Sequence, residues 1–320
     1  MLKRLALFLA GGLFLGSCGS GDIKQINIGG SSTVYPITEA VAEEFRQATR
    51  SDTVNIRITV GVSGTGGGFQ KFIRGEIGIV DASREIYPEE IKAAEKQGVE
   101  YVQLAVAYDG LAVVVNPKND WVEYVTVEEL QKIWEPEAQG VVMQWSDVRE
   151  EWPDASLHLY GPGVASGTFD YFTEVIVGES GKSRGDFTAS EDDNVLVQGV
   201  STDKYALGFF GLAYYEENAD ELKLVGVDNG EGPPVKPSVQ TVSNGTYAPL
   251  SRPLFIYVSA DAAQKESVQK FVEFYLKMAP KLVKQIGYVP MPDSAYQAQM
   301  QKFQQFVSKV ETVADTVATQ

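Results

Sequence analysis

Short apolar segments alternate with amphipathic segments along most of the chain. Residues 54–60 place an apolar side chain at every second position, which predicts a half-buried strand. Ile37, Val41 and Phe45 recur at helical spacing after Pro36, and proline suits the first turn of a helix. Strands that alternate with helices in this way favour an α/β fold with largely parallel sheets.

The same patterns predict the remaining elements. Further strands are expected at residues 23–28, 77–80, 101–107, 111–115, 157–160 and 254–258. Helices are expected from Pro88, after the capping box of Thr126 and Glu129, over residues 169–177 and 264–278, and from Tyr296 onward. Residues 61–68 and 161–168 are expected to be glycine-rich turns, and the proline-rich residues 220–249 irregular surface. Because no long low-complexity linker is present, short hinge strands are expected to join the domains.

Composition and charge narrow the class of protein. A length of 320 residues suits two domains of ~150 residues each, and a hydrophobic fraction of 44% excludes general disorder. The formal charge of −16 argues against nucleic acid and broad adhesion to anionic membranes, so local geometry would have to hold any anion. One Cys and one His exclude a disulfide scaffold and leave no credible zinc site, and no cofactor is expected.

Residues 1–18 are predicted to be an export signal. Lys3 and Arg4 precede an apolar run over residues 5–15, which is too short to span a bilayer as a helix. Residues 15–18 (Leu-Gly-Ser-Cys) resemble the lipobox of bacterial lipoproteins, which implies acylation of Cys18; an incidental cysteine after a plain signal peptide is the alternative. Residues 19–24 are the expected tether. Loss of the two cations takes the charge from −16 to −18, so an acidic, exported, lipid-anchored protein is expected.

Three turns share one design, in which small hydroxyl side chains follow a strand and precede a helix. These turns are residues 31–34, 63–68 and 166–168, and Ser-Gly-Thr occurs in the last two. A helix N-terminus offers unpaired N–H groups and partial positive charge, so three such turns aimed at one point form an anion pocket. Taken singly, each turn also fits an ordinary helix cap.

A nucleotide site does not fit these turns. Residues 61–69 lack the Lys-Ser/Thr ending of a P-loop, and no G-x-G-x-x-G with a downstream acidic partner occurs in the required context.

Asp81-Ala82-Ser83-Arg84 directly follows a predicted buried strand. Arginine is a natural bidentate partner for an oxyanion. An Asp81 carboxylate beside an anion is favourable only if that anion carries a proton to donate, as hydrogen phosphate does and sulfate does not. A salt bridge between Asp81 and Arg84 is the alternative interpretation.

The order of these motifs along the chain resembles that in the phosphate-binding proteins of ABC transporters. The resemblance is to a cyanobacterial-type lipoprotein branch of this family. The resemblance spans nearly the whole mature chain and rests on residues 31–36, 63–68, 81–84, 109–117, 166–168, 206–215 and 250–258. It implies an α/β periplasmic-binding-protein fold of type II, with phosphate clamped in a cleft between two lobes. Residues 25–107 plus 252–320 are the expected first lobe and residues 108–251 the second, hinged near Ala107 and Ser251.

The resemblance also implies which residues bind phosphate. The first lobe is expected to contribute Ser32, Thr33, Val34, Ser63, Thr65, Asp81, Ser83 and Arg84, and the second Ser166, Gly167 and Thr168. The best-known branch has an arginine shortly before its second Ser-Gly-Thr, whereas residues 160–163 contain none. That branch has an aspartate roughly where this chain has Arg84, so Arg84 is expected to supply the guanidinium from the first lobe.

The leading hypothesis is a monomeric solute-binding lipoprotein of the periplasm or cell envelope. It would capture inorganic phosphate and pass it to the permease subunits of an ABC transporter, with no bond broken and no enzyme activity. One alternative is the same fold tuned to sulfate, molybdate or tungstate. Another is an envelope serine hydrolase or phosphatase, for which His158 is the single histidine available as a base.

Overall fold

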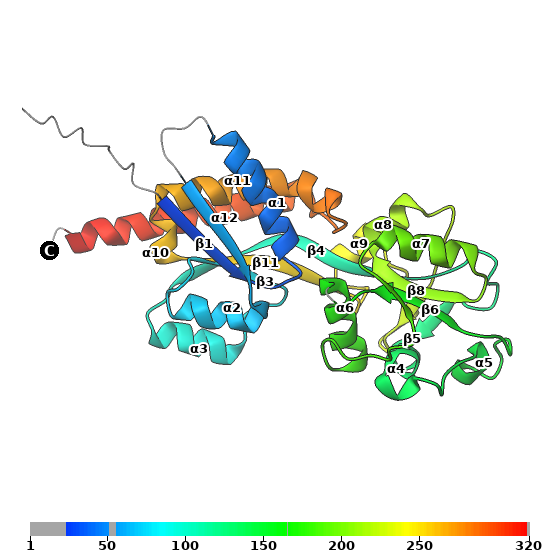
Figure 1. Ribbon diagram of the computed structural model, residues 1–320. Coiled ribbons are helices and arrows are strands. Elements are labelled where there is room, and N and C mark those ends of the chain that lie inside the picture. Colours follow the sequence, from blue (N-terminus) through cyan, green and yellow to red (C-terminus); the bar gives the residue numbers. More distant parts are fainter. Residues whose placement is uncertain (1–23, 51–55, 165, 319–320) are drawn as a thin grey trace, which may run out of the picture.

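The computed structural model describes residues 24–50, 56–164 and 166–318, so the predicted signal peptide and Cys18 lie outside the described residues. Figure 1 shows two α/β lobes side by side, connected through the long strands β4 and β11. The strands are β1 (Lys24–Gly30), β2 (Ile56–Val62), β3 (Ile79–Ala82), β4 (Tyr101–Val115), β5 (Tyr124–Thr126), β6 (His158–Pro162), β7 (Thr188–Ser190), β8 (Ala206–Gly211), β9 (Lys223–Leu224), β10 (Gly226–Asp228) and β11 (Ser251–Ser259).

Helices cover both faces of the sheet in the first lobe, with α1, α11 and α12 on one face and α2 and α3 on the other (Figure 1). The helices are α1 (Tyr35–Ala48), α2 (Gly64–Ile73), α3 (Pro88–Lys96), α4 (Val127–Trp134), η1 (Pro136–Ala138), α5 (Trp145–Val148), α6 (Gly167–Phe172), η2 (Thr173–Val177), α7 (Asp193–Thr202), α8 (Leu212–Glu217), α9 (Val239–Ser243), α10 (Ala260–Ala263), α11 (Glu266–Gln285) and α12 (Asp293–Ala318). None of the described helices combines the length and apolar character needed to cross a bilayer.

One nine-stranded sheet runs through both lobes in the order β2-β1-β3-β11-β4-β8-β6-β7, with β9 added beside β4. The outer pairs are parallel, but β11 is antiparallel to β3 and β4, and β4 is antiparallel to β8. The expectation of a largely parallel sheet was therefore wrong at its centre. The chain leaves the first lobe along β4 and returns along β11, and two neighbouring strands that carry the chain out and back must run antiparallel.

Each lobe has its own apolar core, which matches the two-lobe fold. Ile28, Val41 and Phe271 belong to the core under α1 and α11, whereas Trp134 and Phe209 belong to the core of the second lobe. In the second lobe Phe209 stacks on Phe172, with 3.7 Å between the ring centroids. Burial of these large side chains stabilises each lobe separately.

Some predicted boundaries change for identifiable reasons. Residues 101–107 and 111–115 form one strand, β4, because the sheet continues from one lobe into the other. The predicted turn at residues 61–68 is helical from Gly64, and this helix packs closely on β1: a Cβ added at Gly68 lies 2.7 Å from the Gly30 Cα. Glycine is therefore needed at position 68 to let helix and strand approach.

Candidate functional site

A polar cavity of about 260 Å³ lies where the two lobes meet. Its lining comes from the loop before α1, the start of α2, the turn after β3, the helical segment α6–η2 with the following loop, and the start of β11. The lining residues are Ser31, Ser32, Thr33, Gly64, Thr65, Gly66, Ser83, Arg84, Asp170, Tyr171, Glu174, Ser180 and Arg252. Segments far apart in sequence thus present hydroxyls, amides and charges to one small volume.

A second cavity of about 440 Å³ adjoins the first, and Ser32 lines both. Ser166, Gly167 and Thr168 line this second cavity, together with the acidic side chains of Asp109, Glu191 and Asp193. Each Ser-Gly-Thr turn therefore contributes to a cavity that Ser32 also lines. Of the predicted site residues, Val34, Ser63 and Asp81 line neither cavity.

Hydrogen bonds join the three first-lobe turns to one another. The Ser31 amide donates to the Asp81 carbonyl at 2.9 Å, and the Ser63 amide donates to the Gly30 carbonyl at 2.9 Å. The Thr65 Oγ1 lies 3.1 Å from the Ser83 Oγ and also accepts from the Ser83 amide at 3.2 Å. These bonds preorganise the donors, which reduces the conformational entropy lost when a ligand binds.

The helix starts in these turns differ in what their hydroxyls do. The Ser166 hydroxyl accepts from the Thr168 amide at 3.2 Å and so acts as the N-cap of α6. The Ser63 hydroxyl precedes α2, makes no capping bond, and is buried without a hydrogen-bond partner among the described residues. The capping interpretation therefore applies to Ser166, while the Ser63 hydroxyl stays available for another partner.

The lobes touch where Gly167 faces Thr33. A Cβ added at Gly167 lies 2.9 Å from the Thr33 Oγ1, 3.0 Å from its Cα and 3.2 Å from its backbone nitrogen. Backbone atoms cannot yield as a flexible side chain can, so a larger residue at this position separates the loops. The structure thus brings together one predicted turn from each lobe.

Arg252 was not predicted as a site residue, although it lies at the hinge on β11. Its Nη2 donates to the Thr33 Oγ1 at 3.1 Å, its Nε lies 3.4 Å from the Asp109 Oδ2, and its guanidinium stacks 3.6 Å from the Tyr171 ring. Its Nη1 lies 3.8 Å from a Glu174 carboxylate oxygen. These contacts position a guanidinium, only 14% exposed, beside the hydroxyls of the cavity. The available signal was an arginine at the predicted hinge crossing.

Asp109 forms the buried side of this arginine cluster. Its side chain is 2% exposed, and burial raises its pKa despite the opposing effect of Arg252. A buried carboxylate is stabilised in its charged form by a neighbouring guanidinium. Asp109 therefore positions Arg252 where β4 and β11 pair.

Arg84 also lines the cavity, but its guanidinium already has an acidic partner. Two of its nitrogens donate to the Glu90 carboxylate at 2.8 and 2.9 Å, and its guanidinium stacks 3.6 Å from the Tyr87 ring. The alternative salt bridge between Asp81 and Arg84 is wrong, because Arg84 pairs with Glu90. The positive charge that Arg84 offers an anion is thereby partly neutralised.

Asp81 lies below the loops, with no exposed surface. Its Oδ1 accepts from the Thr38 hydroxyl at 2.8 Å, and that hydroxyl lies 3.1 Å from the Tyr275 hydroxyl. Its Oδ2 is buried without a partner among the described residues. Burial raises the pKa of Asp81 to about 7, and the Thr38 hydrogen bond only partly opposes this.

Asp81→Asn is expected to stabilise the protein more at pH 8 than at pH 5. Between the ordinary pKa of 3.8 and about 7, the folded state keeps a proton that the unfolded state releases, so wild-type stability decreases as the pH rises. Asparagine has no proton to lose here, so it removes this decrease in the free energy of unfolding, which reaches ~4 kcal/mol. Its amide oxygen can still accept the hydrogen bond from Thr38. Thermal unfolding of both proteins at the two pH values measures the effect. Equal differences in Tm at both pH values would contradict it.

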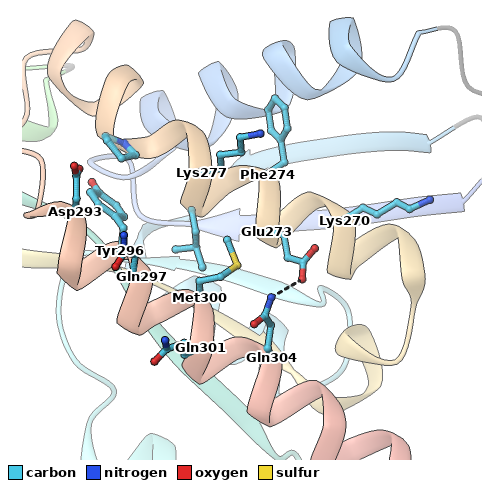
Figure 2. Close-up of a pocket in the computed structure, with 12 residues that line it drawn as sticks. Lys270, Glu273, Phe274, Lys277, Asp293, Tyr296, Gln297, Met300, Gln301 and Gln304 are labelled. Atoms are coloured by element: carbon cyan, nitrogen blue, oxygen red, sulfur yellow. Dashed lines mark hydrogen bonds between the residues drawn. The ribbon is translucent and has the colours of Figure 1, made fainter.

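A larger groove of about 760 Å³ lies between α11 and α12 in the first lobe. Figure 2 shows Phe274 and Met300 among its lining residues, with a 3.3 Å hydrogen bond from Gln304 to Glu273. It shares no lining residue with the two cavities between the lobes. No turn of small hydroxyl residues faces it, so its size does not make it the anion site.

The histidine needed by the hydrolase hypothesis lies elsewhere. The His158 Nδ1 is 2.6 Å from the Asp203 Oδ2, and His158 lines neither cavity between the lobes. His158 is therefore not positioned to activate the serines there. Within the part of the chain that the structure describes, no group of His, Cys, Asp and Glu could hold a metal ion.

Comparison with known proteins assigns this architecture to a family. A sequence profile of the PBP superfamily domain matches residues 17–278. The chain belongs to the PBP superfamily.

Proteins similar to this chain cover nearly its whole length. Protein SphX of Synechococcus elongatus is 50% identical over 307 residues, which cover 94% of this chain and 89% of SphX. The phosphate-binding protein PstS of Staphylococcus saprophyticus is 35% identical over 322 residues, covering 96% and 97%. A crystal structure described as a possible phosphate-binding protein from Planctomyces limnophilus has a TM-score of 0.84 at 45% identity, covering 89% of this chain and 99% of that one.

Proposed function

We propose that the protein captures inorganic phosphate between its lobes and delivers it to the permease of an ABC transporter. The observation that carries this proposal is the small cavity in which hydroxyls and amides of separate turns meet the guanidinium of Arg252. A strongly acidic chain can hold an anion there because nearby oriented donors outweigh the repulsion from distant charges. The similarity to PstS, a phosphate-binding protein, supports phosphate as the anion.

Binding is coupled to closure of the lobes. Ser32, Thr33, Thr65, Ser83 and Arg84 are the proposed contacts from the first lobe, with Val34, Ser63 and Asp81 behind them, and Ser166, Gly167 and Thr168 are those from the second. An anion held by donors of both lobes binds the closed state better than the open state, so it shifts the population toward closure. Water excluded from the closed cavity strengthens each charge-assisted hydrogen bond.

Release to a permease requires only that the lobes open again, so no bond is broken. We place the mature chain in the periplasm or cell envelope as a monomer, anchored through an acylated Cys18, on the resemblance of residues 15–18 to a lipobox. Acyl chains hold such a protein at a membrane surface without spanning it. Mass spectrometry of protein from its native envelope tests the anchor, and an unmodified Cys18 would contradict it.

Calorimetric titration with phosphate, sulfate and molybdate tests the ligand. Phosphate is expected to bind in a 1:1 complex and at least about 100-fold more tightly than the other anions, because a site with fitted hydrogen-bond partners discriminates strongly between analogues. Heat-denatured protein serves as the control. Tight sulfate binding without a response to phosphate would reject phosphate in favour of the other tetrahedral oxyanions.

A further inference from the structure

We propose that Asp170 accepts the proton of bound hydrogen phosphate and thereby makes the site select this anion over sulfate. This inference rests on the proposed function. It assigns the selecting carboxylate to the second lobe, on α6, instead of to Asp81 in the first. The role is that of a specificity-determining contact, since no bond other than a hydrogen bond is made.

Asp170 lies on the wall of the cavity that also holds the proposed first-lobe donors and Arg252. It follows the Ser166–Thr168 turn on α6, and it lines the cavity with Thr33 and Arg252. Among the described residues, its carboxylate makes no hydrogen bond and no ion pair within 4 Å, although Arg252 is near enough to lower its pKa. A carboxylate with free acceptor positions inside an anion site repels an unprotonated anion and binds a protonated one.

The other acidic groups near the cavity are less suited to this role. Glu174 also lines the cavity, but its side chain is 54% exposed and lies 3.8 Å from Arg252. Asp81 lines neither cavity and binds Thr38 instead. Asp109 faces Arg252 from the neighbouring cavity. Of the two carboxylates that line the cavity with Arg252, Asp170 is therefore the one with unused acceptor capacity.

The surroundings of Asp170 also make it a better proton acceptor. Burial raises its pKa above that of an exposed aspartate, and the nearby Glu174 adds to this, while Arg252 opposes it. A higher pKa strengthens the hydrogen bond that the ionised carboxylate accepts from the anion. Sulfate carries no proton at neutral pH, so its binding here leaves two negative groups facing each other.

Calorimetric titrations of wild type, Asp170→Asn, Asp170→Ser, Glu174→Gln and Asp81→Asn with phosphate and sulfate at pH 8 test the proposal. Both Asp170 variants are expected to bind phosphate more weakly and sulfate more tightly, so that the phosphate-to-sulfate selectivity decreases roughly 30-fold. Glu174→Gln and Asp81→Asn test the two rival carboxylates under the same conditions. Circular dichroism confirms that each variant is folded.

Each other outcome has a defined meaning. Unchanged selectivity in both folded Asp170 variants overturns the proposal while leaving phosphate binding intact. Loss of selectivity in Asp81→Asn or Glu174→Gln alone assigns the acceptor to that residue and also overturns it. If the wild-type protein binds sulfate as tightly as phosphate, the proposed function itself is wrong. That result comes from the wild type alone and does not depend on the Asp170 variants.

Discussion

Arg252→Ala is expected to weaken phosphate binding roughly 1,000-fold. The change removes charge-assisted hydrogen-bond donors from the cavity and leaves the Asp109 carboxylate buried without its partner. Arg252→Lys is expected to recover part of the affinity, because lysine keeps the charge but not the planar fork of donors. Isothermal titration calorimetry measures the dissociation constants.

The matched control for Arg252 is Arg46→Ala. Arg46 also pairs with carboxylates, those of Glu39 and Glu43, but it lies on the partly exposed surface of α1 away from the cavity. Its loss is expected to change the dissociation constant by less than about twofold. A folded Arg252→Ala protein that binds phosphate within threefold of wild type would remove Arg252 from the site.

Gly167→Ala is expected to weaken phosphate binding roughly 100-fold with little effect on thermal stability of the ligand-free protein. The added methyl group lies within 3.0 Å of the Thr33 Cα, so the two turns cannot approach as they do here. The open protein does not need this approach, but the fraction of closed protein decreases, and apparent affinity decreases in proportion. Small-angle scattering with and without phosphate measures the closure directly.

Gly232→Ala is the control for this substitution, since a Cβ at Gly232 has open space around it. It is expected to bind phosphate as wild type does and to show the same ligand-induced decrease in radius of gyration. If Gly167→Ala also becomes more compact with phosphate and retains its affinity, the contact between Gly167 and Thr33 does not limit closure.

Much of the site was predictable because it consists of local motifs. A strand followed by a small hydroxyl turn and a helix can be recognised within ten residues or so, and the turns at Ser32, Thr65 and Ser83 do line one cavity. What each polar group contacts was less predictable. Arg84 pairs with Glu90 on the next helix, and Asp81 faces Thr38 on α1, and neither partner follows from spacing along the chain.

The fold was predictable to a similar extent. Period-two and helical patterns located most elements, since they reflect which face of each element is buried. The pairing of β11 with both β3 and β4 depends on contacts between residues about 140 to 180 apart, such as Arg252 with Asp109. Arg252 was missed for this reason: its importance comes from a strand pairing and not from a motif.

The continuity of β4 and β11 through both lobes has a consequence for the order of events during capture. When two rigid lobes rotate about their connection, residues in the connection move little, whereas residues far from it move a long way. Arg252 is paired with Asp109 in the connecting ribbon itself, and the Ser166–Thr168 turn is carried on the body beyond it. In the proposed mechanism, an arriving anion therefore meets a guanidinium that keeps nearly the same place in the open and closed states, and the second-lobe amides move in afterwards to enclose it.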